Sequence, residues 1–553
     1  MKKQWWKEKV VYQIYPKSFK DSNGDGIGDL KGILEKLPYL KNLGIDMVWL
    51  SPVYQSPFID QGYDISDYYK ISEVFGTMED FDTLLAEAKK LGIGIVMDLV
   101  INHCSSEHEW FQKALKDPYG EYAGYFYFEK GKDGNPPSNY RSYFGGSAWE
   151  KVPGTDLYYL HMFAKEQPDL NWENPKVKKE LFDMINWWLD KGIAGFRIDA
   201  IINIKKDVNF PSYEPDGPDG MCACTAMVER VDGIGELLGE LKRETFAKRD
   251  TFTVGEVFNL KEGALEEFVG ENGFDFAPHM LTEGQNGWYD TREVTFLEWK
   301  KTIIQSQMEC QGKAFLSNII ENHDEPRGAS RYLPEYAQNP DGIKMLGCVS
   351  VLLRGIPFIY QGQEIGMTNC RMDSIEDYDD IDTYHQYREA REAGLSEKEA
   401  LEACYGFSRD NARTPMQWDA GENAGFTKGT PWLRVNENYR MVNVADQEKD
   451  PGSVLHFYRK LIALRKSEEW KNVFVYGEFL PLFEEDESLF AYARTDGEKK
   501  AVILANFGKE EMAVKLSENL GKVLLANMYR PQQINAREVV LEPCEVLVCQ
   551  VCE

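Results

Sequence analysis

Eight short β-rich segments alternate with helical segments along most of this 553-residue chain. Each is an apolar run, and between them apolar residues recur at helical spacing, as in Leu30, Ile33, Leu37 and Leu40. Eight such units over about 450 residues predict a (β/α)8 TIM barrel, because an open doubly wound sheet rarely needs this length. The predicted strands are Val11 to Pro16, Ile45 to Val53, Gly92 to Asn102, Gly195 to Ala200, Thr251 to Val257, Phe274 to Ala277, Phe315 to Asn322 and Ile356 to Tyr360.

Two regions depart from this alternation. Residues 104–173 form an aromatic, Gly- and Pro-rich stretch that is too long for an ordinary loop, which predicts a small domain inserted after strand three. From about residue 476 the pattern changes to short strands and turns, as expected for a separate antiparallel β-sandwich domain. The predicted domains are therefore the barrel (1–103 and 174–475), the inserted domain (104–173) and the C-terminal β-domain (476–553).

Charge and hydropathy exclude several classes of partner. Lys and Arg number 63 against 91 Asp and Glu, a net charge of -28, so the surface repels phosphate backbones and a nucleic-acid partner is not expected. The apolar stretches fall well below the ~20 residues that span a bilayer, so no membrane association is expected. Ten cysteines are too few for a disulfide scaffold, and the N-terminal residues contain no export signal. We expect a cytoplasmic monomer with reduced thiols.

Carboxylates follow four of the predicted strands, at the end where TIM barrels place their active sites. They are Asp98, Asp199, Glu256 and Asp324. A ring of acids without Cys or several His ligands suits either a magnesium site or acid/base chemistry on a neutral, hydroxyl-rich substrate. Trp and Tyr residues near the same strand ends favour a sugar.

Five motifs give the chain a specific resemblance. In sequence order they are Asp98-Leu-Val-Ile-Asn-His103, Gln167-Pro-Asp-Leu-Asn171, Gly195-Phe-Arg-Ile-Asp199-Ala200, Val254-Gly-Glu256 and Glu321-Asn-His-Asp324. In order and spacing, these motifs resemble those of the retaining α-glucosidases and α-amylases of glycoside hydrolase family 13. Within that family the chain is most similar to the oligo-1,6-glucosidase and α-glucosidase branch.

The resemblance implies a role for each matching residue. Asp199 corresponds to the nucleophile, Glu256 to the general acid/base and Asp324 to a third acid that binds sugar hydroxyls. Arg197, two residues before Asp199 on the same strand face, is expected to keep Asp199 ionised. Asp60 and Arg413 are expected to close the pocket so that only a chain end enters. The implied substrate-binding residues are Asp60, Tyr63, His103, Phe163, Gln167, Arg197, Ala200, His323 and Arg413.

An acidic, Gly-rich loop near the N-terminus is a candidate calcium site. Asp21, Asn23, Asp25 and Asp29 place oxygen donors at alternate positions, as at the start of a calcium loop. Gly32 occupies the position of the bidentate Glu of an EF-hand, so the loop is not an EF-hand. An acidic turn without an ion is the alternative. The resemblance favours one structural Ca²⁺, held by Asp21, Asn23, Asp25, Ile27 and Asp29, and no organic cofactor is expected.

The resemblance implies an exo-acting retaining α-glucosidase that releases terminal α-D-glucose from short oligosaccharides. Ala200 stands where α-1,6-preferring relatives typically carry Val, which predicts activity on both α-1,6 and α-1,4 linkages. The Ala200→Val substitution is then expected to reduce α-1,4 activity selectively. Substrate choice beyond the first glucose is not readable, because residues 209–233 do not resemble the branch closely.

Other activities within the same family stay open. A transglucosylase would use the same intermediate, and a catalytically inactive member would lack the three acids that are present here. Sucrose isomerases carry an Arg-x-Asp-Arg stretch before the His-Asp motif, whereas the segment taken as equivalent is Gln305-Ser-Gln-Met-Glu309, which disfavours isomerisation. The sequence contains no obvious basic cluster that would bind a phosphorylated substrate such as trehalose 6-phosphate.

Overall fold

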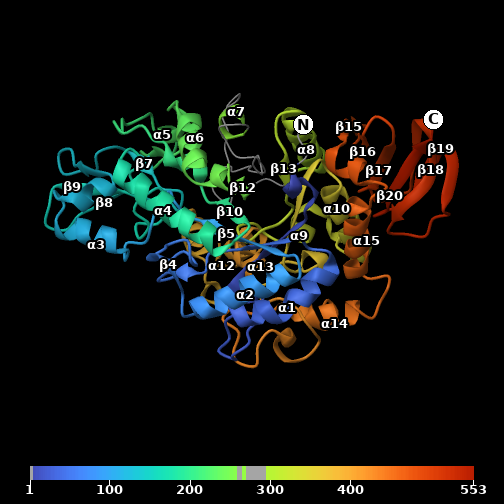
Figure 1. The fold of residues 1–553 in the computed structure, drawn as a ribbon, viewed down its shortest axis with the longest axis horizontal. Helices are drawn as coiled ribbons and strands as arrows, with labels where there is room; N and C mark the ends of the chain where they lie inside the picture. Colours follow the sequence, from blue (N-terminus) through green and yellow to red (C-terminus); the bar gives the residue numbers. More distant parts are fainter. Residues whose placement is uncertain (1–3, 258–264, 270–293, 553) are drawn as a thin grey trace.

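A parallel, curled β-sheet forms the centre of the protein in a computed structural model that describes residues 4–257, 265–269 and 294–552 (Figure 1). The hydrogen-bonded strand order is β12-β10-β5-β2-β1-β14-β13. This arrangement confirms the (β/α) barrel; the strand predicted over Phe274 to Ala277 lies outside the described residues. The strands are β1 (Val11–Ile14), β2 (Met47–Leu50), β5 (Gly94–Leu99), β10 (Gly195–Ile198), β12 (Phe252–Gly255), β13 (Leu316–Asn318) and β14 (Gly355–Tyr360).

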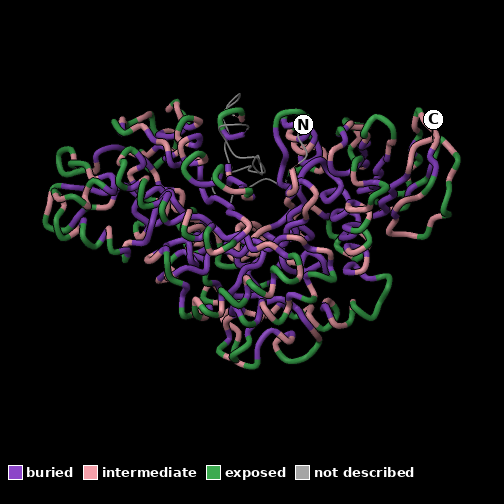
Figure 2. The backbone as a smooth tube through the Cα atoms, in the orientation of Figure 1, coloured by how far each residue is buried: buried purple, intermediate pink, exposed green. Residues whose placement is uncertain are grey.

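Apolar strand composition accounts for the sheet's place at the centre. Every residue of β1, β2 and β14 is buried, as expected for parallel strands that are covered on both faces. Alternate side chains, including Val11, Trp49 and Phe358, form one apolar cluster, and their neighbours pack in the larger core. Figure 2 shows buried backbone running through the middle of the molecule, with exposed backbone mainly at the periphery.

Sequence signals at the helix ends fix where the helices begin and end. The helix α2 starts with a capping box between Thr77 and Asp80, and α4 starts at Asn174-Pro175 and ends at Gly192, whose φ of 99° suits glycine. The described helices are α1 (Leu30–Leu43), α2 (Met78–Lys90), α3 (Glu109–Lys116), α4 (Pro175–Lys191), α5 (Ala226–Glu229), α6 (Ile234–Glu244), α7 (Leu265–Phe268), α8 (Phe296–Cys310), α9 (Gly328–Tyr332), α10 (Pro340–Val351), α11 (Ile381–Glu392), α12 (Glu397–Phe407), α13 (Asp410–Arg413), α14 (Val444–Gln447) and α15 (Val454–Lys466).

The region inserted after β5 contains its own small antiparallel sheet. Strands β6 (Phe128–Lys130), β9 (Leu157–Leu160) and β8 (Trp149–Lys151) pair in that order, and they lie at one end of the molecule (Figure 1). A further strand, β7 (Tyr140–Arg141), pairs with β11 (Cys222–Ala223), and Arg141 forms an ion pair with Asp216. The divergent segment 209–233 thus packs against the insert. Between β2 and α2, β3 (Tyr54–Gln55) pairs with β4 (Asp67–Ile71).

One loop of the insert lies directly against α11, which follows β14 in the chain. Gly145 has a φ of 81°, and a Cβ atom there would lie 1.9 Å from Nε2 of His385. Neither the backbone conformation nor the space therefore allows a side chain. This contact joins the insert to α11.

The C-terminal strands form the predicted antiparallel domain at the opposite end of the molecule (Figure 1). They make one six-stranded sheet in the order β15-β16-β17-β20-β18-β19. Arg494 is fully buried and donates to the carbonyls of Leu352 and Phe474, which ties this sheet to the barrel. The strands are β15 (Glu478–Leu482), β16 (Leu489–Thr495), β17 (Lys500–Asn506), β18 (Met512–Ala526), β19 (Gln533–Leu541) and β20 (Val546–Cys552). Among the described residues, every helix is too short or too polar to cross a membrane.

Candidate active site

A buried arginine gathers three carboxylates at the ends of β5, β10 and β12. Arg197 of β10 donates from Nη1 to Asp98 at 3.0 Å and to Asp199 at 2.7 Å. Its Nη2 lies 2.6 Å from Oε1 of Glu256. The parallel register causes this convergence, because Arg197 is paired with Asp98 of β5 and with Val254, two residues before Glu256. The strand-end acids predicted from the sequence therefore form one cluster.

Burial dominates the electrostatics of this cluster. It raises the pKa of Asp98 to about 6 and the pKa of Asp199 well above its usual range, while the Arg197 guanidinium opposes both shifts. One cation serves three carboxylates, so its effect on each is limited. Arg197 thus favours the ionised form of Asp199 against the effect of burial, and its keeping Asp199 ionised stays a prediction.

Glu256 is the most accessible acid of this cluster and has an unusual neighbour. Its side chain is 32% exposed, against 11% for Asp199. The backbone N–H of Ala200 donates to Oε2 of Glu256 at 2.9 Å. Ala200 has a φ of 42°, in the left-handed region that an alanine seldom occupies, and is only 1% exposed. Its methyl group is therefore buried.

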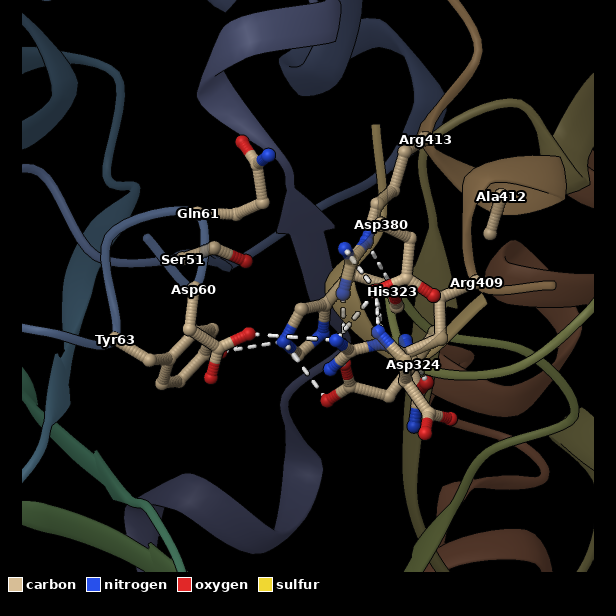
Figure 3. A network of polar contacts seen from close by, with 12 residues as sticks. Ser51, Asp60, Gln61, Tyr63, His323, Asp324, Asp380, Arg409, Ala412 and Arg413 are labelled. Carbon is tan, nitrogen blue, oxygen red and sulfur yellow. Dashed lines mark hydrogen bonds and ion pairs between the residues drawn. The ribbon is translucent and has the colours of Figure 1, made fainter. Parts of the chain in front are cut away.

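A second cluster surrounds Asp324, on the loop after β13 (Figure 3). Arg409 and Arg413 donate to Oδ1 of Asp324 at 3.2 and 3.0 Å, and Nε2 of His323 lies 3.0 Å from Oδ2. Burial favours the neutral acid, but His323 and the two arginines outweigh it and hold the pKa of Asp324 below its usual range. Asp324 is thus an ionised acceptor with 32% of its side chain exposed.

Tyr63 connects the two clusters. Its hydroxyl donates to Oδ2 of Asp98 at 2.9 Å and lies 2.5 Å from Nε2 of His323, on which its ring stacks. Burial lowers the pKa of His323 to about 3, so the imidazole is neutral. The loop after β5 adds His103, whose ring lies 5.0 Å from that of Phe163. His103 also lies 3.1 Å from Gln167, which donates to Asp60.

The arginine that reaches Asp60 is Arg409, which was not predicted from the sequence. Its Nη2 lies 3.3 Å from Oδ1 of Asp60, whereas Arg413, which was expected to close the pocket together with Asp60, contacts Asp324, Asp380 and the carbonyl of His323. Arg409 immediately precedes α13, and Arg413 ends it. The four-residue spacing, which puts two side chains on one helix face, was the available signal.

The candidate calcium loop lies apart from both clusters. Asp21 accepts hydrogen bonds from the backbone of Asn23, Gly24 and Gly26, and Asp25 accepts one from Ile27. The hydroxyl of Thr427 also donates to Asp21, so each oxygen of Asp21 accepts two hydrogen bonds, whereas each oxygen of Asp25 accepts one and keeps a lone pair for an ion. The described residues contain no cluster of three or more His, Cys, Asp or Glu arranged for a metal. Mixed oxygen donors, including the Asn23 amide and the Ile27 carbonyl, still fit the chemistry of Ca²⁺.

Comparison with known proteins identifies the family. The model of the α-amylase catalytic domain matches residues 13–474, so the chain belongs to this family and is a glycoside hydrolase. Oligo-1,6-glucosidase from Parageobacillus thermoglucosidasius is 44% identical over 562 residues, covering 100% of both chains. Crystal structures of trehalose-6-phosphate hydrolase from Bacillus licheniformis and isomaltulose synthase from Protaminobacter rubrum are also similar over 100% of each chain. Their TM-scores are 0.92 and 0.93, at 38% and 36% identity. The resemblance to family 13 is confirmed.

Proposed function

We propose that this protein is an exo-acting retaining α-glucosidase that releases terminal α-D-glucose from short α-1,6- and α-1,4-linked oligosaccharides. One observation carries the proposal: adjacent nitrogens of Arg197 hold the carboxylates of Asp199 and Glu256. Retaining glycosidases need two carboxyl groups about 5 Å apart, one on each side of the bond that is cleaved. The oligo-1,6-glucosidase names of relatives from Parageobacillus thermoglucosidasius and Bacillus cereus, 44% and 42% identical, support the same activity.

The proposed reaction has two displacements. In the first, an oxygen of ionised Asp199 attacks the anomeric carbon while the bond to the leaving oxygen breaks, and Glu256 donates a proton to that oxygen. In the second, Glu256 removes a proton from a water molecule, whose oxygen attacks the anomeric carbon and displaces Asp199. Two inversions at one carbon give net retention. The greater exposure of Glu256 suits a group that must meet the leaving oxygen and then water.

The second cluster supplies the hydroxyl-binding groups. Ionised Asp324 and the guanidinium of Arg409 can accept and donate hydrogen bonds to neighbouring sugar hydroxyls. The anionic groups around the reacting carbon stabilise the positive charge of an oxocarbenium-like transition state. The contact between Arg409 and Asp60 crosses from the loop after β14 to the loop after β2, which supports a pocket for a chain end.

Two related activities are distinguished by products rather than by residues. The names of solved neighbours include isomaltulose synthase and trehalose-6-phosphate hydrolase. The segment Gln305 to Glu309 lies within α8, where Gln307 is buried and accepts a hydrogen bond from the backbone of Arg354. It belongs to the helical layer, so its lack of arginines carries no argument against isomerisation.

The deciding experiment follows products by NMR for isomaltose, maltose, sucrose, trehalose 6-phosphate and starch. We expect α-glucose as the first anomer released from isomaltose and maltose, with starch left intact. Initial β-glucose would contradict retention. Conversion of sucrose into an isomeric disaccharide, or turnover of the phosphorylated sugar alone, would replace the proposal with the corresponding activity.

Three further properties are proposed on separate grounds. A Ca²⁺ ion in the loop of Asp21 to Asp29 would brace the chain after β1 against Thr427, whose hydroxyl already donates to Asp21. A reducing, cytoplasmic location agrees with ten free cysteines, nine of them buried. We also propose a monomer, which light scattering would test.

A further inference from the structure

The guanidinium of Arg409 makes short hydrogen bonds to one carboxylate and longer ones to two others. Its Nε and Nη2 both donate to Oδ1 of Asp380, at 3.0 and 2.5 Å. Its contacts with Asp324 and Asp60 are longer, at 3.2 and 3.3 Å. Because charge-assisted hydrogen bonds strengthen as they shorten, the side that faces Asp380 fixes the plane of the guanidinium. The two longer contacts are the weaker ones, so sugar hydroxyls can replace them more readily.

Asp380 itself is rigidly held and out of reach of a substrate. It is 1% exposed and caps the N-terminus of α11, accepting hydrogen bonds from the backbone and hydroxyl of Thr383. Its own backbone N–H donates to Asp410, at the start of α13. Both the helix dipole and these donors favour an anion at this position. Asp380 is therefore a fixed negative charge beside Arg409 and Arg413 (Figure 3).

Asp380 also balances the charge of two buried arginines that contact Asp324. Arg409 and Arg413 both approach Oδ1 of Asp324, and Nη1 of Arg413 also lies 3.6 Å from Asp380. Without Asp380, the two buried guanidinium groups would depend more heavily on Asp60 and Asp324 as counter-ions. Asp380 takes up part of that positive charge, which leaves Asp324 and Asp60 available to sugar hydroxyls. The remaining face of Arg409 is covered by the ring of Phe144, 5.4 Å away.

We propose that Asp380 is a positioning residue for glucose binding, which acts through Arg409 by holding its guanidinium between Asp60 and Asp324. The inference rests on the proposed function, because it assumes that these three groups bind the terminal glucose. It predicts that Asp380 matters for binding of glucose itself, and only while Arg409 is present.

A double-mutant cycle tests this with Asp380→Asn, Arg409→Gln and their combination. Asn at 380 keeps the size and the capping oxygen, so the helix start is preserved. Asp377→Asn is the matched control, since Asp377 completes the capping box of a short helix by accepting from Ser374 and is only partly buried. The readouts are KM and kcat for isomaltose, the inhibition constant of glucose, and the melting temperature.

Each single variant is expected to raise KM and the glucose inhibition constant about 10-fold or more, with a smaller change in kcat. The combined variant is expected to bind glucose within about twofold of Arg409→Gln alone, because the effects pass through one residue. The control should match the wild type. Unchanged glucose inhibition in Asp380→Asn, or effects that multiply in the combined variant, would overturn the inference.

Two further comparisons cover a variant that does not fold and a wild type that is inactive. If Asp380→Asn does not fold, the combined variant is compared with Arg409→Gln: equal glucose binding supports positioning, and weaker binding indicates a structural role and overturns it. If the wild type turns over neither isomaltose nor maltose, the proposed function fails. Calorimetry with glucose on the same variants then tests the positioning role alone.

Discussion

Nζ of Lys206 lies 3.0 Å from Oδ2 of Asp169, and neither side chain has any exposed surface. Lys206 follows the nucleophile candidate by seven residues, and Asp169 lies two residues after Gln167 in the insert. Lys206 also donates to Oδ1 of Asn102, just before His103. This ion pair therefore sets the insert, with its pocket residues, at a fixed position relative to the chain that carries Asp199.

Removing the Lys206 cation should lower the free energy of unfolding. The Lys206→Met substitution would leave Asp169 buried without its partner, which typically costs about 3–5 kcal/mol of unfolding free energy. The adjacent Lys205→Met is the matched control, because Lys205 pairs with Glu173 at a partly exposed site. Denaturation by urea should show a large loss only for Lys206→Met, partly restored by adding Asp169→Asn. Equal losses in the two lysine variants would contradict the argument.

Asp199 is expected to be indispensable for turnover. The Asp199→Ala substitution should reduce kcat by about 10⁴-fold or more while the protein remains folded, because it removes the attacking oxygen. Azide, a small nucleophile, should restore glycosyl transfer and give a β-glucosyl azide. Near-normal rates on isomaltose, with an unchanged melting temperature, would show that another residue is the nucleophile.

The backbone at Ala200 changes the prediction for the linkage variant. With φ at 42°, a β-branched residue is strained there, and we expect Ala200→Val to lose about 1–2 kcal/mol of stability. The strain would also displace the N–H that holds Glu256, so isomaltose and maltose should both be cleaved more slowly. Ala200→Gly, which relieves the strain, is the control. A selective loss of maltose activity in Ala200→Val would favour the steric interpretation made from sequence.

Glu321 should make stability depend on pH. Burial raises its pKa to about 7, although Arg327 opposes the shift. The unfolded chain loses this proton near pH 4, so between about pH 4 and 7 the folded state binds more protons and stability falls as pH rises. Melting temperatures of Glu321→Gln, measured against the wild type, should therefore improve from pH 5 to pH 8. The exposed Glu335→Gln should show a constant difference; the same behaviour in Glu321→Gln would refute the assignment.

Chelation tests the calcium loop. Excess EDTA should lower the melting temperature, and Ca²⁺ but not Mg²⁺ should restore it, because a bound ion stabilises only the folded state. The Asp21→Asn variant should respond to neither. An unaffected wild type that contains no metal by elemental analysis would leave the loop as an acidic turn.

The sequence predicted the positions of the site residues better than the contacts between them. Strand periodicity and turn signals were enough to place Asp98, Arg197 and Glu256 at strand ends, because parallel register then brings them together. The partnership of Asp60 with Arg409 joins residues 349 positions apart, and no local pattern encodes it. The positive φ at Ala200 was equally unpredictable, since alanine, unlike glycine or asparagine, carries no preference for that conformation.

The buried cysteine thiols can report when each region of this protein unfolds locally. A thiol reagent can reach Cys552 in the folded state, whereas the other nine cysteines are enclosed. Their modification must wait for the surrounding structure to open, so the labelling rate of each cysteine reports the opening of its own neighbourhood. Cys222 and Cys224 report on the segment that packs against the insert, Cys348 on the barrel and Cys549 on the C-terminal sheet. Mass spectrometry of partly labelled protein could then order the loss of these three regions without any added probe.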